Sequence, residues 1–227
     1  MKNVLITGAG RGIGLSLAKE FLNNGYKVLA TYRNPNSAKE LLKLAEENKN
    51  LTVVTADVSD ESSFGDLKAA VQHLGHIHIL INNAGVIGGK ARSLSDLNLN
   101  DMNQVFQTNT FGPIRICKAV MPFVPKEGKV VQISSLMGSI SDNGSGGYYD
   151  YRMSKTALNM FNMCLSMEFP EVTCLTLHPG WVQTAMGGAG ATVPTDECAK
   201  GLYKVITSAT AAQSGDFIDY RGNELPW

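Results

Sequence analysis

The sequence predicts a single α/β domain, residues 1–227, in which a doubly wound, mainly parallel sheet of seven strands carries helices on both faces. Short apolar runs alternate along the chain with longer segments whose apolar residues recur at helical spacing, and this alternation is typical of parallel sheets. The length of 227 residues fits one domain with a sizeable core rather than two.

The composition indicates which partners the protein is expected to have and where in the cell it is expected to be. Twenty basic and twenty acidic residues give a net charge of zero, which does not favour nucleic acid or an anionic membrane. No apolar run approaches the ~20 residues of a membrane span, and the first strand begins too early for a signal peptide. The four cysteines are isolated and lack metal-ligand spacing. We therefore expect a cytoplasmic protein with reduced thiols, no metal and no nucleic-acid or membrane partner.

The first strand, at 4–6, runs into the glycine-rich stretch TGAGRGIG and then into a helix. This order opens a Rossmann-type dinucleotide-binding fold. Glycine reaches positive φ without a Cβ penalty, and the helix N-terminus offers N–H groups to phosphates. The spacing differs from the common G-x-G-x-x-G, and a turn without a ligand is the alternative reading. The expected cofactor-binding residues here are Thr7, Gly8, Gly10, Arg11, Gly12, Ile13 and Gly14.

The second strand, at 27–31, ends where the adenosine ribose of a dinucleotide arrives. An acidic residue there would bind the 2′-hydroxyl of NAD, but the sequence has Tyr32, Arg33 and Asn34. Arg33 and Arg11 could instead flank a 2′-phosphate, which suits the guanidinium fork. We therefore expect NADP(H) as the cofactor, with NAD(H) as the alternative. If no dinucleotide binds, the two arginines are simply solvated surface residues.

The next elements are a helix at 37–47, a strand within 51–58 and a helix at 61–74. Asp57, near the end of that strand, could contact the adenine or cap the following helix. A fourth strand, at 78–81, leads into NNAG at 82–85, where Ala84 and Gly85 leave room for a flat ligand.

A long helix, at 101–124, contains Pro113. Proline lacks the N–H that would bond to the carbonyl of Asn109, so the helix should bend there and leave that carbonyl free. A kink that is merely tolerated is the alternative.

The second half continues the alternation. A strand at 129–134 is followed by a glycine- and serine-rich loop at 138–147 and a helix, then by a strand at 172–177. A substrate flap is expected at about 184–207, including a helix from about 195, before the last strand at 216–220.

A serine at a strand end, Tyr151 and Lys155 make a plausible proton-transfer set. Tyr151 and Lys155 are four residues apart and share a helix face. Free tyrosine has a pKa of roughly 10, and a nearby ammonium would lower it. Packing alone also places tyrosine and lysine on one face. Chemistry does not distinguish Ser134 from Ser135.

Taken together, these motifs resemble the short-chain dehydrogenase/reductase family over the whole chain. The resemblance implies a catalytic tetrad of Asn109, Ser135, Tyr151 and Lys155. It also implies that the cofactor contacts Asp57, Val58, Asn83, Ala84, Gly85, Tyr151, Lys155, Pro179, Gly180, Val182 and Thr184. HPGWVQTAMGG and the ending GDFIDYRGNELPW are similar to a narrower group, the bacterial C-factor proteins and the sniffer-type carbonyl reductases. The segment between Ser135 and Tyr151 is longer than in the common family pattern.

The resemblance implies an NADPH-dependent reductase that acts on a small aldehyde or ketone. A signalling protein of the C-factor kind, with little turnover, is the first alternative, and an epimerase or dehydratase on a related fold is the second. In relatives, the helix that carries Tyr151 and the kinked helix before it often form a twofold contact, and here the first of these adds apolar surface through Leu158, Met160, Phe161 and Leu165. We therefore expect a homodimer or a tetramer.

Overall fold

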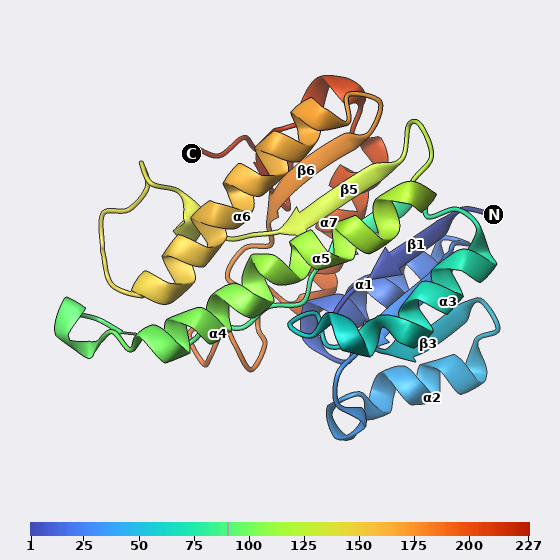
Figure 1. The fold of residues 1–227 in the computed structure, drawn as a ribbon, viewed down its shortest axis with the longest axis horizontal. Coiled ribbons are helices and arrows are strands. Elements are labelled where there is room, and N and C mark those ends of the chain that lie inside the picture. Colours follow the sequence, from blue (N-terminus) through green and yellow to red (C-terminus); the bar gives the residue numbers. More distant parts are fainter. Residues whose placement is uncertain (90) are drawn as a thin grey trace.

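Seven strands form one sheet in the computed structural model, which describes residues 1–89 and 91–227 (Figure 1). The strand order is β3-β2-β1-β4-β5-β6-β7, and every neighbouring pair is parallel. The strands are β1 (Asn3–Ile6), β2 (Lys27–Tyr32), β3 (Leu51–Thr55), β4 (Ile79–Asn82), β5 (Lys129–Ile133), β6 (Thr173–His178) and β7 (Phe217–Asp219). The order reverses between β1 and β4, which confirms the doubly wound class and places the expected ligand crevice there.

Helices cover both faces of this sheet (Figure 1). They are α1 (Gly12–Asn23), α2 (Lys39–Glu47), α3 (Gly65–Leu74), α4 (Leu99–Asn109), α5 (Phe111–Val120), α6 (Tyr149–Glu168) and α7 (Thr195–Ser208). One core cluster joins the sheet to α1, α2 and α7, and a second joins it to α3, α5 and α6. The central strand β1 is apolar from Val4 to Ile6 because both of its faces are covered. In β1, Val4 and Ile6 enter the first cluster and Leu5 the second.

Two expected elements differ from those observed. The helix expected at 101–124 is divided at Thr110 into α4 and α5, and a short 3₁₀ turn, Met121–Phe123, follows. The flap expected at 184–207 extends too far, because its second part is α7. The apolar side of α7, including Cys198 and Leu202, lies in the core cluster shared with α1. Only 184–194 is left as a candidate flap.

No helix in the described part of the chain is long and apolar enough to span a membrane.

Candidate active site

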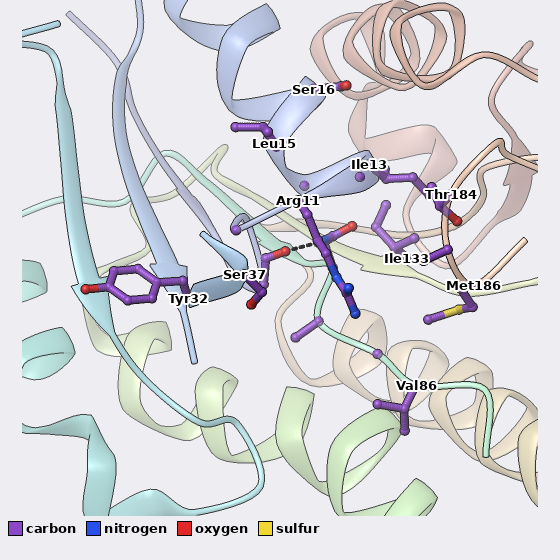
Figure 2. A pocket seen from close by; sticks show the side chains of 18 of the residues that line it. Arg11, Ile13, Leu15, Ser16, Tyr32, Ser37, Val86, Ile133, Thr184 and Met186 are labelled. Carbon is purple, nitrogen blue, oxygen red and sulfur yellow. Dashed lines mark hydrogen bonds between the residues drawn. The ribbon is translucent and has the colours of Figure 1, made fainter. Parts of the chain in front are cut away.

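A cleft of about 770 Å³ opens at the carboxyl ends of the strands (Figure 2). The glycine turn, the end of β2, the residues after β4 and the first turns of α6 all line it. Of the residues expected to bind the cofactor, all except Thr7, Gly180 and Val182 line this cleft, and the last two line a neighbouring cavity. The fold therefore brings together residues that lie far apart in the sequence.

The glycine turn brings bare backbone to the wall of the cleft. Gly8 and Gly12 have positive φ, +65° and +57°. A Cβ on Gly14 would lie 2.6 Å from the Gly8 carbonyl oxygen, so the close approach of α1 to the turn requires glycine. The N-terminus of α1 has no side-chain cap and no acidic residue in its first turn, which leaves N–H groups for an anion. These features fit the pyrophosphate of a dinucleotide.

Thr7 and Asn83 tie the glycine turn to the end of β4. The Asn83 amide donates to the carbonyls of Thr7, at 2.9 Å, and Gly8, at 3.1 Å. The Thr7 hydroxyl accepts from the backbone N–H of Asn83, at 3.0 Å, and of Ala84, at 3.2 Å. Thr7 is buried and does not line the cleft, so it fixes the walls of the cleft, and its contact with a cofactor stays a prediction.

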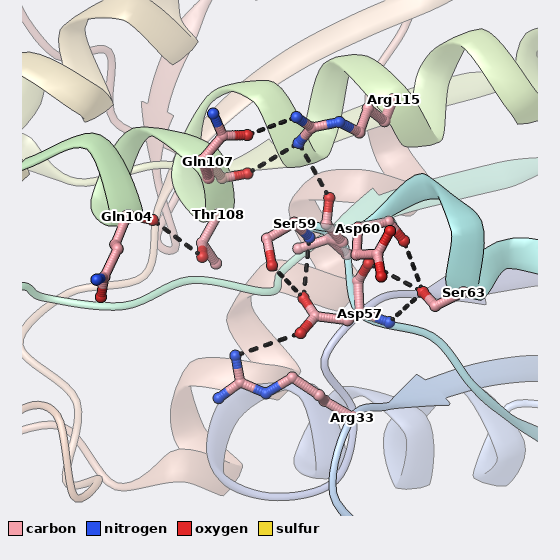
Figure 3. A network of polar contacts seen from close by, with 10 residues as sticks. Arg33, Asp57, Ser59, Asp60, Ser63, Gln104, Gln107, Thr108 and Arg115 are labelled. Carbon is pink, nitrogen blue, oxygen red and sulfur yellow. Dashed lines mark hydrogen bonds and ion pairs between the residues drawn. The ribbon is translucent and has the colours of Figure 1, made fainter. Parts of the chain in front are cut away.

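Arginines lie at the adenosine end of the cleft. Arg11 extends into it (Figure 2). Arg33 is largely exposed, and its guanidinium lies 3.7 Å from the Asp57 carboxylate (Figure 3). Asp57 accepts hydrogen bonds from the backbone and hydroxyl of Ser59, so it stabilises its own turn, whereas Asp60 caps the following 3₁₀ turn. An exposed ion pair of this kind contributes only about 0–1 kcal/mol, and Arg33 can exchange it for a phosphate.

Lys155 lies buried at the inner end of the cleft. Its ammonium donates to the Ile133 carbonyl at 2.9 Å, and desolvation lowers the pKa of Lys155 to about 8. The nitrogen is 5.8 Å from the centre of the Tyr151 ring. Lys155 therefore carries a charge that the fold holds with a neutral carbonyl.

Tyr151 and Ser135 lie together beside this lysine. Burial raises the pKa of Tyr151, while a side-chain hydrogen bond with Ser135 acts in the opposite direction. The expectation that Lys155 depresses this pKa is wrong for this structure, because the ammonium is bound to Ile133 and the phenol is desolvated. The neighbouring Ser134 instead donates to the Asn159 side chain. Its hydroxyl is thus engaged, and Ser135 is the serine next to Tyr151.

Asn109 is the last residue of α4, and Pro113 gives its carbonyl no donor four residues ahead. The helix break that Pro113 predicted is present, with Thr110 at φ −116° and ψ −61°. The Asn109 amide also holds the loop after β4, accepting from the Val86 N–H and donating to the Val86 carbonyl, both at 2.8 Å. Its amide nitrogen donates to Ser154 of α6 as well, at 3.0 Å. Nothing in the sequence indicated this side-chain role.

A second cavity, of about 410 Å³, adjoins the cleft. The two share several lining residues, including Tyr151 and Met186, and Ser135 lines only the second. Its walls also include Tyr148 and Arg152, which the sequence did not single out. The sequence could not have indicated Tyr148, whose φ of +51° is rare for a bulky residue. Arg152 could have been identified, because it directly follows Tyr151 in the sequence.

His178, the last residue of β6, is a packing residue. Its Nδ1 accepts from the backbone N–H of Leu136, at 3.2 Å. Burial lowers the pKa of His178 to about 4, so the ring is neutral at pH 7.

Comparisons with known proteins agree with this geometry. The family described as short chain dehydrogenase matches residues 2–192. The C-signal protein of Myxococcus xanthus is 44% identical over 158 residues, which cover 67% of this chain and 94% of that protein. The structure of the carbonyl reductase Sniffer of D. melanogaster superposes with a TM-score of 0.95 at 32% identity, over the full length of both chains. An NADPH-bound carbonyl reductase from chicken fatty liver gives a TM-score of 0.91 at 36% identity, covering 100% of this chain and 99% of that one. The chain belongs to the short-chain dehydrogenase/reductase family of NAD(P)-dependent oxidoreductases.

Proposed function

We propose that this protein is an NADPH-dependent reductase of aldehydes or ketones. The observation that carries the proposal is the position of Tyr151, which lines both the cleft and the adjoining cavity, while Ser135 lines the cavity beside it. A carbonyl compound in the second cavity would therefore meet a proton donor at the boundary with the cofactor cleft. The solved relatives named as carbonyl reductases support this reaction class.

Each residue of the site has its own role in the proposed reduction. A bound nicotinamide dinucleotide supplies the hydride. The raised pKa of Tyr151 keeps its phenol protonated at neutral pH, so it can donate a proton to the substrate oxygen. The Ser135 hydroxyl holds that oxygen, and Lys155, one turn further along α6, provides the positive charge beside the transfer. The Asn109 amide keeps the loop at Val86 in place against the cleft.

The proposed preference for NADPH depends on Arg11 and Arg33. Both line the cleft, and neither is bound to a buried acid that would hold it away from a phosphate. The chicken reductase was solved with NADPH, and a Pseudomonas aeruginosa carbonyl reductase, 35% identical with a TM-score of 0.88 over all of both chains, with NADP. These relatives support the same cofactor here.

A signalling role with little turnover is the second candidate, because the C-signal protein of Myxococcus xanthus is 44% identical. Such a protein would bind the dinucleotide but reduce few carbonyl compounds. A cytoplasmic location and a homodimeric or tetrameric state remain predictions.

A steady-state screen of neutral aldehydes and ketones with NADPH and NADH tests the proposal. We expect turnover with NADPH, and Tyr151→Phe should lower it by at least ~100-fold, the usual contribution of a general acid. Fluorescence titration should show that this variant binds NADPH nearly as the wild type does. Absence of turnover across the panel in a protein that binds NADPH would favour the signalling role, and near-normal turnover of a folded Tyr151→Phe variant would remove Tyr151 from its role.

A further inference from the structure

The second cavity has an apolar wall with a single charge in it. Its side chains are mostly apolar or aromatic, among them Met137, Trp181 and Met186. Among the described residues that line it, Arg152 is the one ionised side chain, and the lining includes no aspartate or glutamate. The cavity is therefore electropositive.

The Arg152 guanidinium is held in place by neutral groups. Nε donates to the Gly146 carbonyl at 3.3 Å and Nη1 to the Met137 carbonyl at 3.4 Å, while Nη2 donates to the Ser145 hydroxyl at 2.9 Å. A guanidinium has five N–H donors, so two are left for another partner. These contacts fix the fork without neutralising its charge.

The carboxylate nearest in sequence does not neutralise it either. Asp150 is buried, and its side chain accepts from the backbone N–H of Gly89, at 3.0 Å, and of Tyr151, at 2.8 Å. In the described part of the chain, no ion pair joins Arg152 to an acidic side chain. Arg152 therefore presents a full positive charge, in a fixed orientation, at the wall of a mostly apolar cavity.

We propose that Arg152 binds a carboxylate on the substrate, so that the preferred substrates are apolar carbonyl compounds with a carboxylate remote from the reacting carbonyl. The inference rests on the proposed function, because the cavity must be the substrate site. A carboxylate is the expected anion because it is planar, matches two parallel N–H donors and carries the single charge that one guanidinium balances. The apolar walls contact the body of the same molecule.

A matched pair of aldehydes isolates the charge. At pH 7, 4-formylbenzoate is an anion, because a carboxyl group has a pKa of about 4, whereas its methyl ester is neutral. With NADPH and wild-type protein, we expect kcat/KM for the anion to exceed that for the ester by about tenfold or more, the scale of a charge-assisted hydrogen bond. Equal values for the two aldehydes would overturn the proposal.

Variants separate recognition of the anion from support of the loop. In Arg152→Gln the preference for the anion should disappear, through a fall in kcat/KM for 4-formylbenzoate with a much smaller change for the ester. Arg152→Lys should keep part of the preference, since it keeps the charge but loses the fork. If Arg152 only supported the loop, Arg152→Gln would lower kcat/KM for both aldehydes by the same factor. That result would refute the proposal.

Arg92 provides the matched control. Its guanidinium stacks 4.4 Å from the centre of the Tyr148 ring and donates to the Tyr148 hydroxyl, but Arg92 does not line the cavity. Arg92→Gln removes the same charge from the same rim, and it should leave the ratio between anion and ester at the wild-type value. If Arg92→Gln also lost the preference for the anion, the preference would come from the overall positive charge around the cavity mouth and not from Arg152.

A binding measurement keeps this inference separate from the proposed reaction. Calorimetric titration of the NADP⁺-bound protein with 4-(hydroxymethyl)benzoate and its methyl ester needs no turnover. We expect measurable binding of the anion to the wild type and at least tenfold weaker binding to Arg152→Gln. Binding with no turnover would count against the reductase and for the carboxylate site, whereas turnover of neutral aldehydes with no preference for the anion would do the reverse.

Discussion

Lys155 holds a charge in a buried position, and its desolvation has a consequence for stability. The pKa of Lys155 is about 8 in the folded protein, against 10.5 for a free lysine side chain. Between these two values the unfolded chain binds more protons than the folded one, so folding becomes more favourable as the pH rises through this window. Below pH 8 the buried ammonium opposes folding by up to about 3 kcal/mol.

Lys155→Met should therefore separate stability from activity. We expect the free energy of unfolding at pH 7 to rise relative to the wild type, and this difference to shrink at pH 10, where the wild-type lysine is mostly neutral when folded. At pH 7, where the wild-type lysine is charged, turnover should fall by at least ~100-fold. Urea unfolding at the two pH values, in the absence of cofactor, measures the difference, and a gap that does not change with pH would show that the lysine is not desolvated.

We also expect cofactor choice to depend on single side chains. Two guanidinium groups at a 2′-phosphate should favour NADPH over NADH by roughly 2 kcal/mol, or about thirtyfold in affinity. Arg33→Ser should weaken NADPH binding severalfold and leave NADH binding unchanged, because NADH has no phosphate there. Fluorescence titration with both cofactors decides the point. Tighter binding of NADH by the wild type would contradict the assignment of both arginines.

The residue scale is also where the sequence was least informative. Ser134 and Ser135 are adjacent at one strand end, and they are distinguished by Asn159, which lies 25 residues away on α6 and binds the Ser134 hydroxyl. The direction of the Tyr151 pKa shift depends on how deeply the fold buries the phenol and where the lysine points. Such contacts are tertiary, and local spacing does not contain them.

Among the elements, the break between α4 and α5 was the most predictable irregularity. A proline lacks an N–H wherever it occurs, so Pro113 determines which carbonyl is left without its helical donor. The sequence did not show how the break is accommodated. Arg115 donates to the Gln107 carbonyl at 3.2 Å and also to the Gln107 side chain, which covers a carbonyl at the end of α4 (Figure 3).

The variant Pro113→Ala tests whether the break between α4 and α5 contributes to turnover. Alanine restores the donor and suits a helix better by up to ~3 kcal/mol, so stability should hold or increase. We infer that the free Asn109 carbonyl and the Lys155 ammonium hold an ordered water between them and that this water passes protons toward Tyr151, so turnover of the variant should fall and its pH profile should shift. Kinetics from pH 6 to 10 together with thermal melts test this. Unchanged turnover and pH profile in the variant would show that the break is only tolerated.

At the scale of the whole molecule, the alternation of apolar strands and amphipathic helices was enough to predict the sheet and its helices. Because both faces of the sheet are covered, the central strands contain short apolar runs, such as Val4 to Ile6, that are visible in the sequence. The limits of the flap were not predictable. A glycine-rich segment and the amphipathic helix after it are adjacent in sequence, but the packing of α7 against α1 assigns that helix to the core.

Self-association remains a prediction, but the residues of α6 that are exposed for a contact differ in part from those expected. Leu158 and Leu165 are buried within the subunit, whereas Met153, Met160 and Met167 are exposed at 48%, 63% and 75%. Their spacing of seven residues places them along one side of α6. Met160→Glu should shift a dimer toward monomer, because it would bury a charge in the contact. Sedimentation velocity at micromolar concentration measures this, and a wild type that sediments only as a 24.4 kDa species would reject the dimer.

The two adjoining cavities are built from different parts of the chain. The cofactor cleft depends on the glycine turn and on strand ends that are locked together, as by Thr7 and Asn83. The outer walls of the second cavity come largely from two loops, near Met137 to Tyr148 and near Trp181 to Gly187. Evolution can therefore change the length and composition of these loops with little disturbance to the nucleotide half. A graft of the 138–147 loop from a homologue should transfer substrate preference while the dissociation constant for NADPH stays the same.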